Sequence, residues 1–600
     1  MWKRVLWISL SLILLLEGPA LAYTEKELLQ LAKLALENQF YDLSLEYLSR
    51  FKNQYPKSDL APYGLVLEGI TLRRLGKLSE AKETFTAVIF GFPESEYTGQ
   101  AYYLRGETNL ALSLFSQAEE DFKTSLDRKI PEEMGVAAYR GILSSQASRG
   151  KIFEALTTLR EMEGRYPQLT TERETQKILI AAAEQSITTA LRERDFAKVY
   201  TVTDLIQKEF PEISGLEKLL YYRATALYQE GKLHQAQSEL QRLKKSSDPE
   251  IAGLASFRLG EVFFSLKDYA GAEAHFLEAK EKSPDLEVKA ASAFQLGVIA
   301  RKKQDYSRSE AYLQEAWQTS QEEAVKEKSL WELATTSFLS GNYQKALSLY
   351  QTFRNSFPGS EFKEAAFLQE AFALYNLKRY RQAKDVFEKF LALYPESNFA
   401  GQASYGLGLT FMVLGEKKRG AEVWEGFLSK EAKISSQAPM VLLLARYFIE
   451  ENKPKEAETY LQRLVAVQDI EADMRAEAFL LLGLAFLKET RIKESITAFD
   501  AGLQLPITRK DLKESLMKNK ADLLMVKGDY EKALPLYQEL LNNGLLEKRG
   551  EILYGAGVCL HQLGKTQEAV PFYLEAMLHL PADSPLIKKI KEALNQIKKR

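Results

Sequence analysis

The sequence predicts an all-α, right-handed superhelical solenoid of about fifteen helix-turn-helix repeats, each ~37 residues long. Three observations predict this fold. One phrase recurs along the chain at a nearly fixed period. Small residues are kept in two columns of the aligned repeats. Proline closes many repeats at the same place. A fixed period of this length indicates stacked repeats, which bury their apolar faces against neighbouring repeats.

The repeating phrase is clearest in three segments, 76–97, 341–362 and 378–399, which read GKLSEAKETFTAVIFGFPESEY, GNYQKALSLYQTFRNSFPGSEF and KRYRQAKDVFEKFLALYPESNF. Ala346 serves as the anchor of its repeat, and an equivalent residue recurs in fifteen copies. Nine of the fourteen spacings equal 37, and thirteen lie between 36 and 38. The anchors are Ser44, Ala81, Ala118, Ala155, Val199, Ala236, Ala272, Ser309, Ala346, Ala383, Gly420, Ala457, Ser495, Ala533 and Ala569.

Each repeat pairs small positions with a bulky one. The anchor is small in fourteen copies, and glycine or alanine stands twelve residues before it in thirteen. A ring such as Phe85 or Trp424 commonly follows the anchor by four residues, on the same helix face. Small residues let two helix axes approach to ~8–10 Å. Eight copies place proline twelve residues after the anchor, where the second helix must end. Serines such as Ser58 and Ser397, two residues later, are expected to cap the next helix.

The chain divides where the period fails. The spacing between Ala155 and Val199 is 44 residues, which predicts a lengthened loop or helix near 168–176. We therefore expect an N-terminal array of four repeats over 23–167 and a C-terminal array of eleven over 168–582. Residues 583–600 form a basic helix that would cap the last repeat, because solenoid ends need a polar outer face. Peripheral membrane contact through this helix is the alternative.

Residues 1–22 have the features of a secretory signal peptide. Lys3 and Arg4 precede an apolar run from Val5 to Leu16, and Ala20-Leu21-Ala22 supplies the small residues of a cleavage site. Cleavage there would place the protein in the periplasm. An uncleaved segment would instead anchor it in the inner membrane. The expected new N-terminus is Tyr23, so the sequence does not predict lipid attachment to a cysteine there.

The small columns, the turn aromatics such as Tyr343 and Tyr380, and the terminal prolines resemble the tetratricopeptide repeat over about residues 24–585. The repeats are longer than the 34 residues of that family. The "YPxS" and "FPxS" phrases and the signal peptide are similar to those of bacterial envelope proteins, of the outer-membrane assembly lipoprotein and Tol–Pal coordinating type. This resemblance implies a scaffold that binds other envelope proteins or peptides.

No chemistry of another class is predicted. The formal net charge is −2, so nothing indicates a nucleic-acid partner. The four histidines are scattered and Cys559 is the only cysteine, so no metal site or cofactor is expected. Gly564-Lys565-Thr566 lacks the first glycine and the preceding strand of a phosphate-binding loop. No catalytic residue is predicted, and the protein is not expected to be an enzyme.

The candidate binding surface is a column of rings on first helices. From the sixth repeat to the eleventh, aromatic residues fill most positions fifteen residues before the anchor, and large residues recur seven residues further on, on the same helix face. These rings either pack between neighbouring first helices or line a concave groove for a peptide or partner helix. The candidate residues are Tyr221, Tyr228, Phe257, Phe264, Phe294, Trp331, Phe338, Tyr375, Tyr405 and Met412.

The predicted function is therefore a non-catalytic, protein-binding scaffold of the bacterial envelope, in assembly or export. The alternative is a carbohydrate-binding or enzyme-accessory solenoid of a polysaccharide or cell-wall system, in which the rings would stack on sugars.

Overall fold

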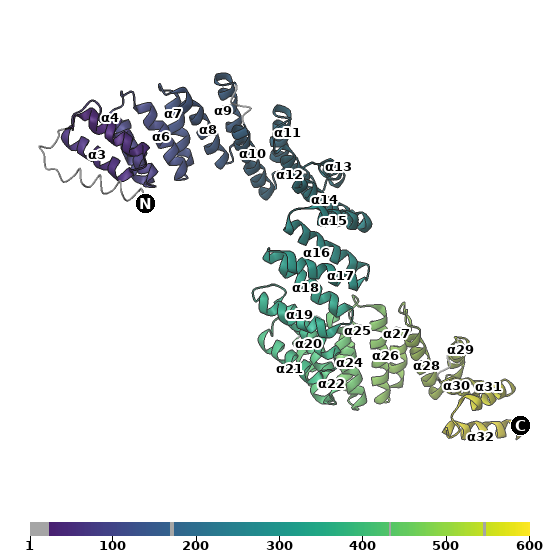
Figure 1. The fold of residues 1–600 in the computed structure, drawn as a ribbon. Helices are drawn as coiled ribbons and strands as arrows, with labels where there is room; N and C mark the ends of the chain where they lie inside the picture. The colour runs from purple at the N-terminus through teal and green to yellow at the C-terminus, as the bar shows by residue number, and fades with distance from the viewer. Residues whose placement is uncertain (1–22, 168–172, 431–433, 544–547, 600) are drawn as a thin grey trace. The chain divides into compact units, whose positions relative to one another are not determined.

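The computed structural model describes residues 23–167, 173–430, 434–543 and 548–599, and Figure 1 shows their fold. These residues form fifteen consecutive helical pairs followed by one more helix, α32 (Pro585–Lys599), and they contain no strand. The predicted all-α solenoid of about fifteen helix-turn-helix repeats is confirmed. The predicted signal peptide, residues 1–22, lies outside the described residues.

The first helices of the pairs are 13 to 21 residues long. They are α2 (Glu25–Glu37), α4 (Ala61–Arg74), α6 (Thr98–Ala111), α8 (Glu132–Ser148), α10 (Arg173–Glu193), α12 (Leu216–Gln229), α14 (Pro249–Ser265), α16 (Leu286–Lys302), α18 (Glu323–Leu339), α20 (Lys363–Asn376), α22 (Ala400–Val413), α24 (Ala438–Glu450), α26 (Ala472–Lys488), α28 (Lys510–Lys527) and α30 (Arg549–Gln562).

The second helices are shorter, at 11 to 14 residues. They are α3 (Tyr41–Gln54), α5 (Leu78–Gly91), α7 (Phe115–Leu126), α9 (Ile152–Arg165), α11 (Phe196–Glu209), α13 (Leu233–Leu243), α15 (Tyr269–Lys282), α17 (Tyr306–Thr319), α19 (Tyr343–Ser356), α21 (Tyr380–Leu393), α23 (Lys417–Leu428), α25 (Pro454–Val465), α27 (Ile492–Leu503), α29 (Tyr530–Asn542) and α31 (Thr566–His579). A 3₁₀ turn, η1 (Ser435–Gln437), precedes α24.

The chain forms two compact units. The N-terminal unit holds the described residues up to Ile299 together with Thr319–Gln321, and the C-terminal unit holds Ala300–Gln318 and the described residues from Glu322 onward. The division predicted at residue 168 remains a prediction, since 168–172 lie outside the described residues. The long spacing there coincides with α10, which at 21 residues is the longest described helix.

Every pair is joined by the same left-handed turn. Five residues before each anchor the backbone has positive φ, in seven repeats at a glycine and in eight at another residue, such as Lys378 with φ of 58°. The residue after it donates its N–H to a carbonyl five positions earlier, as Arg379 does to Leu374 at 2.9 Å. This hydrogen bond closes a Schellman motif at the end of each first helix. The turn fixes the angle at which the second helix leaves.

The small columns make the helix–helix contact that the sequence predicts. Ser495, an anchor, donates its hydroxyl to the carbonyl of Gly483 at 2.7 Å, twelve residues earlier on the facing helix. The ring that follows the anchor fills the space beside a glycine. A Cβ added at Gly106 would lie 2.9 Å from the ring of Phe122, and one at Gly141, in the next repeat, would lie 2.3 Å from it. The Phe122 ring is therefore held between the backbones of two first helices.

The serines in the loops between repeats do not cap helices as expected. Ser58 accepts from the N–H of Leu60 at 3.0 Å, which closes a turn just before α4 begins at Ala61. The two-residue turn between serine and helix is the physical reason. The Ser58 hydroxyl also donates to Glu25, in the first turn of the preceding first helix, at 2.7 Å. Ser397 and Glu364 repeat this contact at 2.6 Å, so the loop is fastened to the repeat before it.

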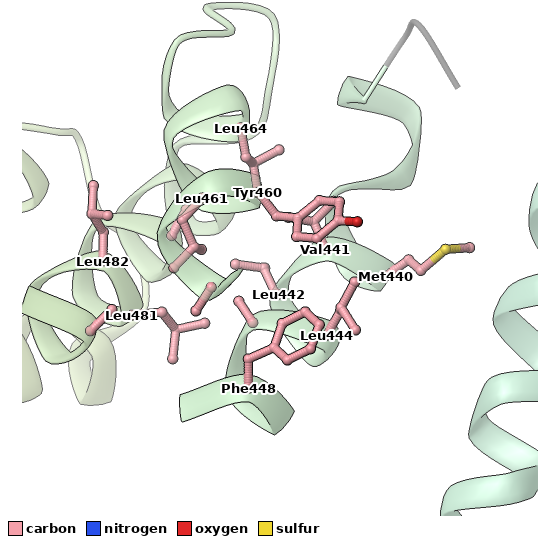
Figure 2. Packing of buried hydrophobic residues seen from close by; sticks show 14 of the residues in the cluster. Met440, Val441, Leu442, Leu444, Phe448, Tyr460, Leu461, Leu464, Leu481 and Leu482 are labelled. Atoms are coloured by element: carbon pink, nitrogen blue, oxygen red, sulfur yellow. The ribbon is translucent and has the colours of Figure 1, made fainter. Parts of the chain in front are cut away.

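Mostly aliphatic and aromatic side chains form the core of the C-terminal unit around α24, as Figure 2 shows. Met440, Val441 and Leu444 are at most 1% exposed, and they pack with Leu461 of α25 and Leu482 of α26. At the end of the chain, α32 buries Ile590 and Ile597 against α30 and α31. Among the described residues, no helix combines the length and the apolarity that a membrane span requires.

Candidate functional site

Successive repeats contact one another mainly through the second helix of one repeat and the first helix of the next, and some neighbouring first helices also touch directly. Within the C-terminal unit, α20 lies against α22, and α26 lies against both α24 and α28. The positions fifteen, eleven and eight residues before each anchor are spaced as i, i+4 and i+7, so they share one face of the first helix. We call this the inner face. The predicted ring column occupies its first and third positions.

In the N-terminal unit the predicted tyrosines contact polar partners. The ring of Tyr228 lies under the guanidinium of Arg258, 5.4 Å from the ring centre, and its hydroxyl is 3.3 Å from that of Ser265. Tyr221 is buried, with its hydroxyl 3.5 Å from Arg258. Arg258 also pairs with Glu261 at 2.6 Å. Burial raises the pKa of Glu261, although the Arg258 charge opposes this shift.

The predicted phenylalanines of this unit pack inside their own repeats. The rings of Phe257 and Phe276 lie 5.5 Å apart, and Phe264 meets Tyr269 edge-on at 5.3 Å. Phe294, on α16, is half-buried. These contacts join a first helix to the second helix of the same repeat. They serve packing, one of the two interpretations of the ring column.

The predicted rings of the C-terminal unit also pack against other side chains on one side. Trp331 stacks on Phe362, in the loop before α20, with ring centres 5.2 Å apart and planes 17° apart. Phe338 and Tyr375 meet Tyr343 and Tyr380, the first residues of their second helices, edge-on at 5.2 and 5.4 Å. All three nevertheless remain half-exposed. Tyr405 and Met412 are also half-exposed and pack on the core around α24.

The structure adds residues that the ring pattern misses. Phe372, Leu409 and Leu484 occupy the middle position of the inner face and are half-exposed. Leu339 and Val413, just beyond the inner face on α18 and α22, are 50% and 49% exposed. A count of aromatics overlooked them because most are aliphatic. A search for inner-face positions that lack charged residues would have found Phe372, Leu409 and Leu484.

Together these positions lie on the inner faces of the five successive first helices α18, α20, α22, α24 and α26, and we call them the apolar stripe; Leu368 and Leu442 are buried beneath its surface. Its residues are Trp331, Thr335, Phe338, Leu368, Phe372, Tyr375, Tyr405, Leu409, Met412, Leu442, Arg446, Ile449, Leu480, Leu484 and Leu487. Arg446 is the one charged member, and α22 carries no charged residue anywhere along its length. Contiguous apolar surfaces of this kind mark interaction sites.

Ion pairs bound the stripe at both ends. Before it, Arg301 of α16 pairs with Glu332 at 2.8 Å. After it, Lys518 of α28 pairs with Asp522 at 2.8 Å and with Glu551 at 3.1 Å. Burial alone would lower the pKa of Lys518, but these two carboxylates raise it overall. The charged groups beyond the stripe are thus already paired.

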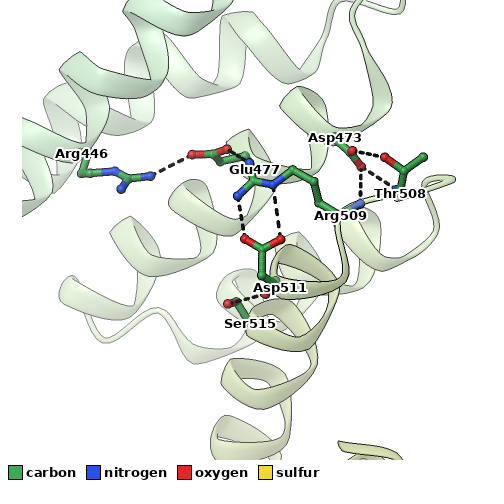
Figure 3. Close-up of polar contacts among 7 residues, drawn as sticks. All are labelled: Arg446, Asp473, Glu477, Thr508, Arg509, Asp511 and Ser515. Atoms are coloured by element: carbon green, nitrogen blue, oxygen red, sulfur yellow. Dashed lines mark hydrogen bonds and ion pairs between the residues drawn. The ribbon is translucent and has the colours of Figure 1, made fainter. Parts of the chain in front are cut away.

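Arg446 of the stripe belongs to a polar network, which Figure 3 shows. Arg446 donates to Glu477 at 2.8 Å, and Arg509 reaches the same carboxylate at 2.9 Å and Asp511 at 2.8 Å. Nearby, Asp473 accepts from the N–H of Thr508 at 2.8 Å and from its hydroxyl. The hydrogen bonds of Thr508 hold the pKa of Asp473 below its usual value.

No group of three or more His, Cys, Asp or Glu side chains that could hold a metal ion occurs in the part of the chain that the structure describes. Cys559 is fully buried in α30. Burial raises the pKa of its thiol to about 12, which keeps the sulfur protonated and unreactive.

A tetratricopeptide repeat family model matches residues 221–287 and 518–585, at both ends of the region that holds the stripe. The chain is a tetratricopeptide repeat protein. A second model, described as an outer membrane lipoprotein, matches residues 323–478 of this repeat protein, which run from the start of α18 into α26. The tetratricopeptide repeats identify the molecule as a protein-interaction scaffold.

Solved structures similar to this tetratricopeptide repeat protein include Naa15/Naa10 bound to HypK-THB, at 14% identity over 96% of each chain with a TM-score of 0.33. Yeast Tom70 is 15% identical over 86% of this chain and 99% of its own, with a TM-score of 0.31. A tetratricopeptide repeat protein from Parabacteroides merdae is 15% identical over 45% and 98%, with a TM-score of 0.25. No curated protein matches the sequence.

Proposed function

We propose that the protein is a non-catalytic scaffold of the bacterial cell envelope that binds other proteins on the inner face of its C-terminal unit. The observation that carries the proposal is the apolar stripe: thirteen of its fifteen residues are apolar, and most are half-exposed. Exposed apolar surface of this extent is unfavourable in water, and a protein partner would remove it from solvent.

Two features support a location in the bacterial cell envelope. The outer membrane lipoprotein model matches residues 323–478, which nearly coincide with the helices that carry the stripe. Residues 1–22 have the sequence of a secretory signal peptide, which favours the periplasm. A role in envelope assembly or export fits both features. Tyr23 stands where a lipoprotein would carry its lipidated cysteine, so we do not propose lipid attachment at that site.

The alternative of sugar stacking has less support. Trp331 already stacks on Phe362, and Phe338 and Tyr375 pack edge-on against the tyrosines of their own turns. The half-exposed aliphatic residues between them, such as Leu409, offer no flat ring to a sugar. A protein partner uses both kinds of side chain.

Site-specific photo-crosslinking in the native host tests the proposal. A photoreactive residue replaces Val413, which is 49% exposed beside the stripe. One control is Gln229, at the equivalent exposed position of α12 in the N-terminal unit; the other is Leu393, 56% exposed on the second helix α21. We expect discrete adducts with envelope proteins from Val413 and few from either control. Equal adducts from all three sites, or none from Val413, would contradict the proposal.

A further inference from the structure

We propose that the apolar stripe receives one amphipathic α-helix of a partner protein, with its apolar face against the stripe and an acidic side chain against Arg446. This inference rests on the proposed function and specifies the class of partner and a residue that selects it. It concerns only the C-terminal unit, which contains the whole stripe.

The width of the stripe matches one helix. Its first and third positions are seven residues apart on each first helix, which corresponds to ~10.5 Å at 1.5 Å per residue. An α-helix with its side chains is ~10–12 Å wide, whereas neighbouring extended strands are only ~4.8 Å apart. Exposed polar residues Lys328 and Gln402 lie on one side, and on the other Asn376 and Glu450 alternate with the exposed Leu339 and Val413. A single helix would cover the apolar width and meet polar groups at both edges.

The chemistry of the stripe requires an apolar contact face. Burying a charge without a partner is costly, and the stripe offers a charged partner at one position only. Leu339 and Val413 extend the apolar surface toward solvent. Side chains at i, i+3, i+4 and i+7 of a bound helix would therefore have to be apolar.

Arg446 supplies the charge complementarity. Its side chain is 54% exposed and donates to Glu477, which is shared with Arg509. A guanidinium has five N–H groups, and the others on Arg446 have no partner among the described residues. A carboxylate on the bound helix would form a charge-assisted pair with them, while a lysine there would be repelled. The partner helix is thus expected to be acidic at the position that faces α24.

The length of the stripe sets the length of the occupant. Five first helices at ~8–10 Å spacing cover ~32–40 Å, which corresponds to a helix of about 21–27 residues. Beyond both ends the inner face carries paired charges, Arg301 with Glu332 and Lys518 with Asp522. An apolar helix face that continued past these pairs would have to desolvate them.

The probes are three synthetic, fluorescently labelled 25-residue peptides, measured by anisotropy against the full mature chain. The first is an amphipathic helix of leucine, alanine and glutamine with one glutamate beside its apolar face, about six residues from the centre of the peptide, so that it can face α24. The second carries lysine in place of the glutamate. The third is a scrambled version of the first that lacks an apolar face. We expect the glutamate peptide to bind at least tenfold more tightly than either of the others.

The variant Arg446→Glu should reverse the preference, so that the lysine peptide binds better. The matched control is Arg381→Glu, on the exposed surface of the second helix α21, which should leave the preference unchanged. Val413→Asp should weaken all binding at least tenfold. It is a second test that does not depend on Arg446→Glu folding, because Val413 is half-exposed.

Equal binding of the glutamate and lysine peptides would overturn the role of Arg446. Equal binding of the scrambled peptide would overturn the helical occupant. If crosslinks from Val413 capture envelope proteins while the peptides fail in this way, the proposed function stands and this inference falls. If neither experiment detects binding, both fall.

Discussion

The inner faces of the two units differ in how many charged residues they carry on the same framework. In the N-terminal unit the inner face holds charges that pair across repeats: Arg73 pairs with Glu107, and Glu184 pairs with Lys218, which lies just outside this face on the next first helix. In the C-terminal unit the equivalent positions from α18 to α26 are apolar, with the exception of Thr335 and Arg446. Charged residues thus interrupt the apolar residues of the N-terminal face, whereas from α18 to α26 only Arg446 does so.

Beneath these faces the packing is the same. Gly69 in the N-terminal unit and Gly408 in the C-terminal unit both lie against the ring that follows the anchor of their repeat, Phe85 and Trp424. The anchors Ala81 and Ala346 are both fully buried. The repeat therefore fixes the positions between the two helices and leaves the inner face free to vary. Function is to be sought where the chain varies while the framework does not.

The largest effect is expected from the buried charges of the N-terminal unit. Asp121 of α7, 4% exposed, accepts from Arg105 at 2.6 and 3.0 Å and from Asn109 at 2.8 Å. Asp121→Ala leaves these donors unpaired and should lower the free energy of unfolding by about 3–5 kcal/mol. Val423→Ala, at the equivalent position of α23, should lower it by less than about 1.5 kcal/mol. Urea denaturation measures both. Equal losses would mean that Asp121 and its hydrogen bonds stabilise the fold no more than an apolar side chain at the same position of the repeat.

Trp331→Ala tests whether the rings of the stripe also hold the fold. Trp331 contacts Phe362, Tyr350 and Phe353 with ring centres 5.2 to 5.8 Å apart. Its removal should lower the free energy of unfolding by about 3 kcal/mol, since it leaves a cavity among these rings. The exposed Leu339→Ala should change it by no more than about 0.5 kcal/mol. If the Trp331→Ala protein is as stable as the wild type, the Trp331 ring does not stabilise the fold and serves only binding.

Gly408→Ala tests the framework that the units share. A Cβ at Gly408 would lie 2.0 Å from the indole nitrogen of Trp424, so the ring must move, at a cost of about 1–3 kcal/mol. Gly426→Ala, on the next helix, meets no atom within 4 Å and should instead stabilise the helix by up to about 1 kcal/mol. Thermal melting of both variants compares them. A Gly408→Ala variant more stable than the wild type would contradict the close contact between Gly408 and the Trp424 ring.

The smallest effect concerns acid stability in the C-terminal unit. The hydrogen bonds of Thr508 lower the pKa of Asp473, so its contribution is present above the unfolded-state pKa of about 3.9 and is lost as the pH falls through the lower folded-state value. At about pH 5 the Asp473→Asn variant should therefore be less stable than the wild type. This difference in the free energy of unfolding should shrink as the pH falls to about 2. Urea midpoints across this range measure it. A constant difference would contradict the carboxylate's role.

Much of the fold could be predicted because its determinants recur. The period and the small anchors showed the helical pairs. The left-handed turn before each second helix was not predicted, since residues such as Lys378 and Thr490 adopt it as often as glycine does. The expected serine caps were wrong because a two-residue turn separates Ser58 from α4.

The candidate site was predicted in part. The rings of Phe338, Tyr375 and Tyr405 lie on the stripe, but the aliphatic members escaped notice because leucine is equally common in the buried core. Only the exposure of residues such as Leu409 and Val413 distinguishes stripe from core, and exposure is a tertiary property. Whether the column binds a partner remains a proposal.

Hydrogen–deuterium exchange of the full mature chain, with and without the glutamate peptide, tests the central claim most directly. The account predicts slower exchange confined to the first helices α18, α20, α22, α24 and α26, with no change in α4, α6 or α8 of the N-terminal unit. Protection of the N-terminal first helices, protection of second helices alone, or no protection at a saturating peptide concentration would contradict it.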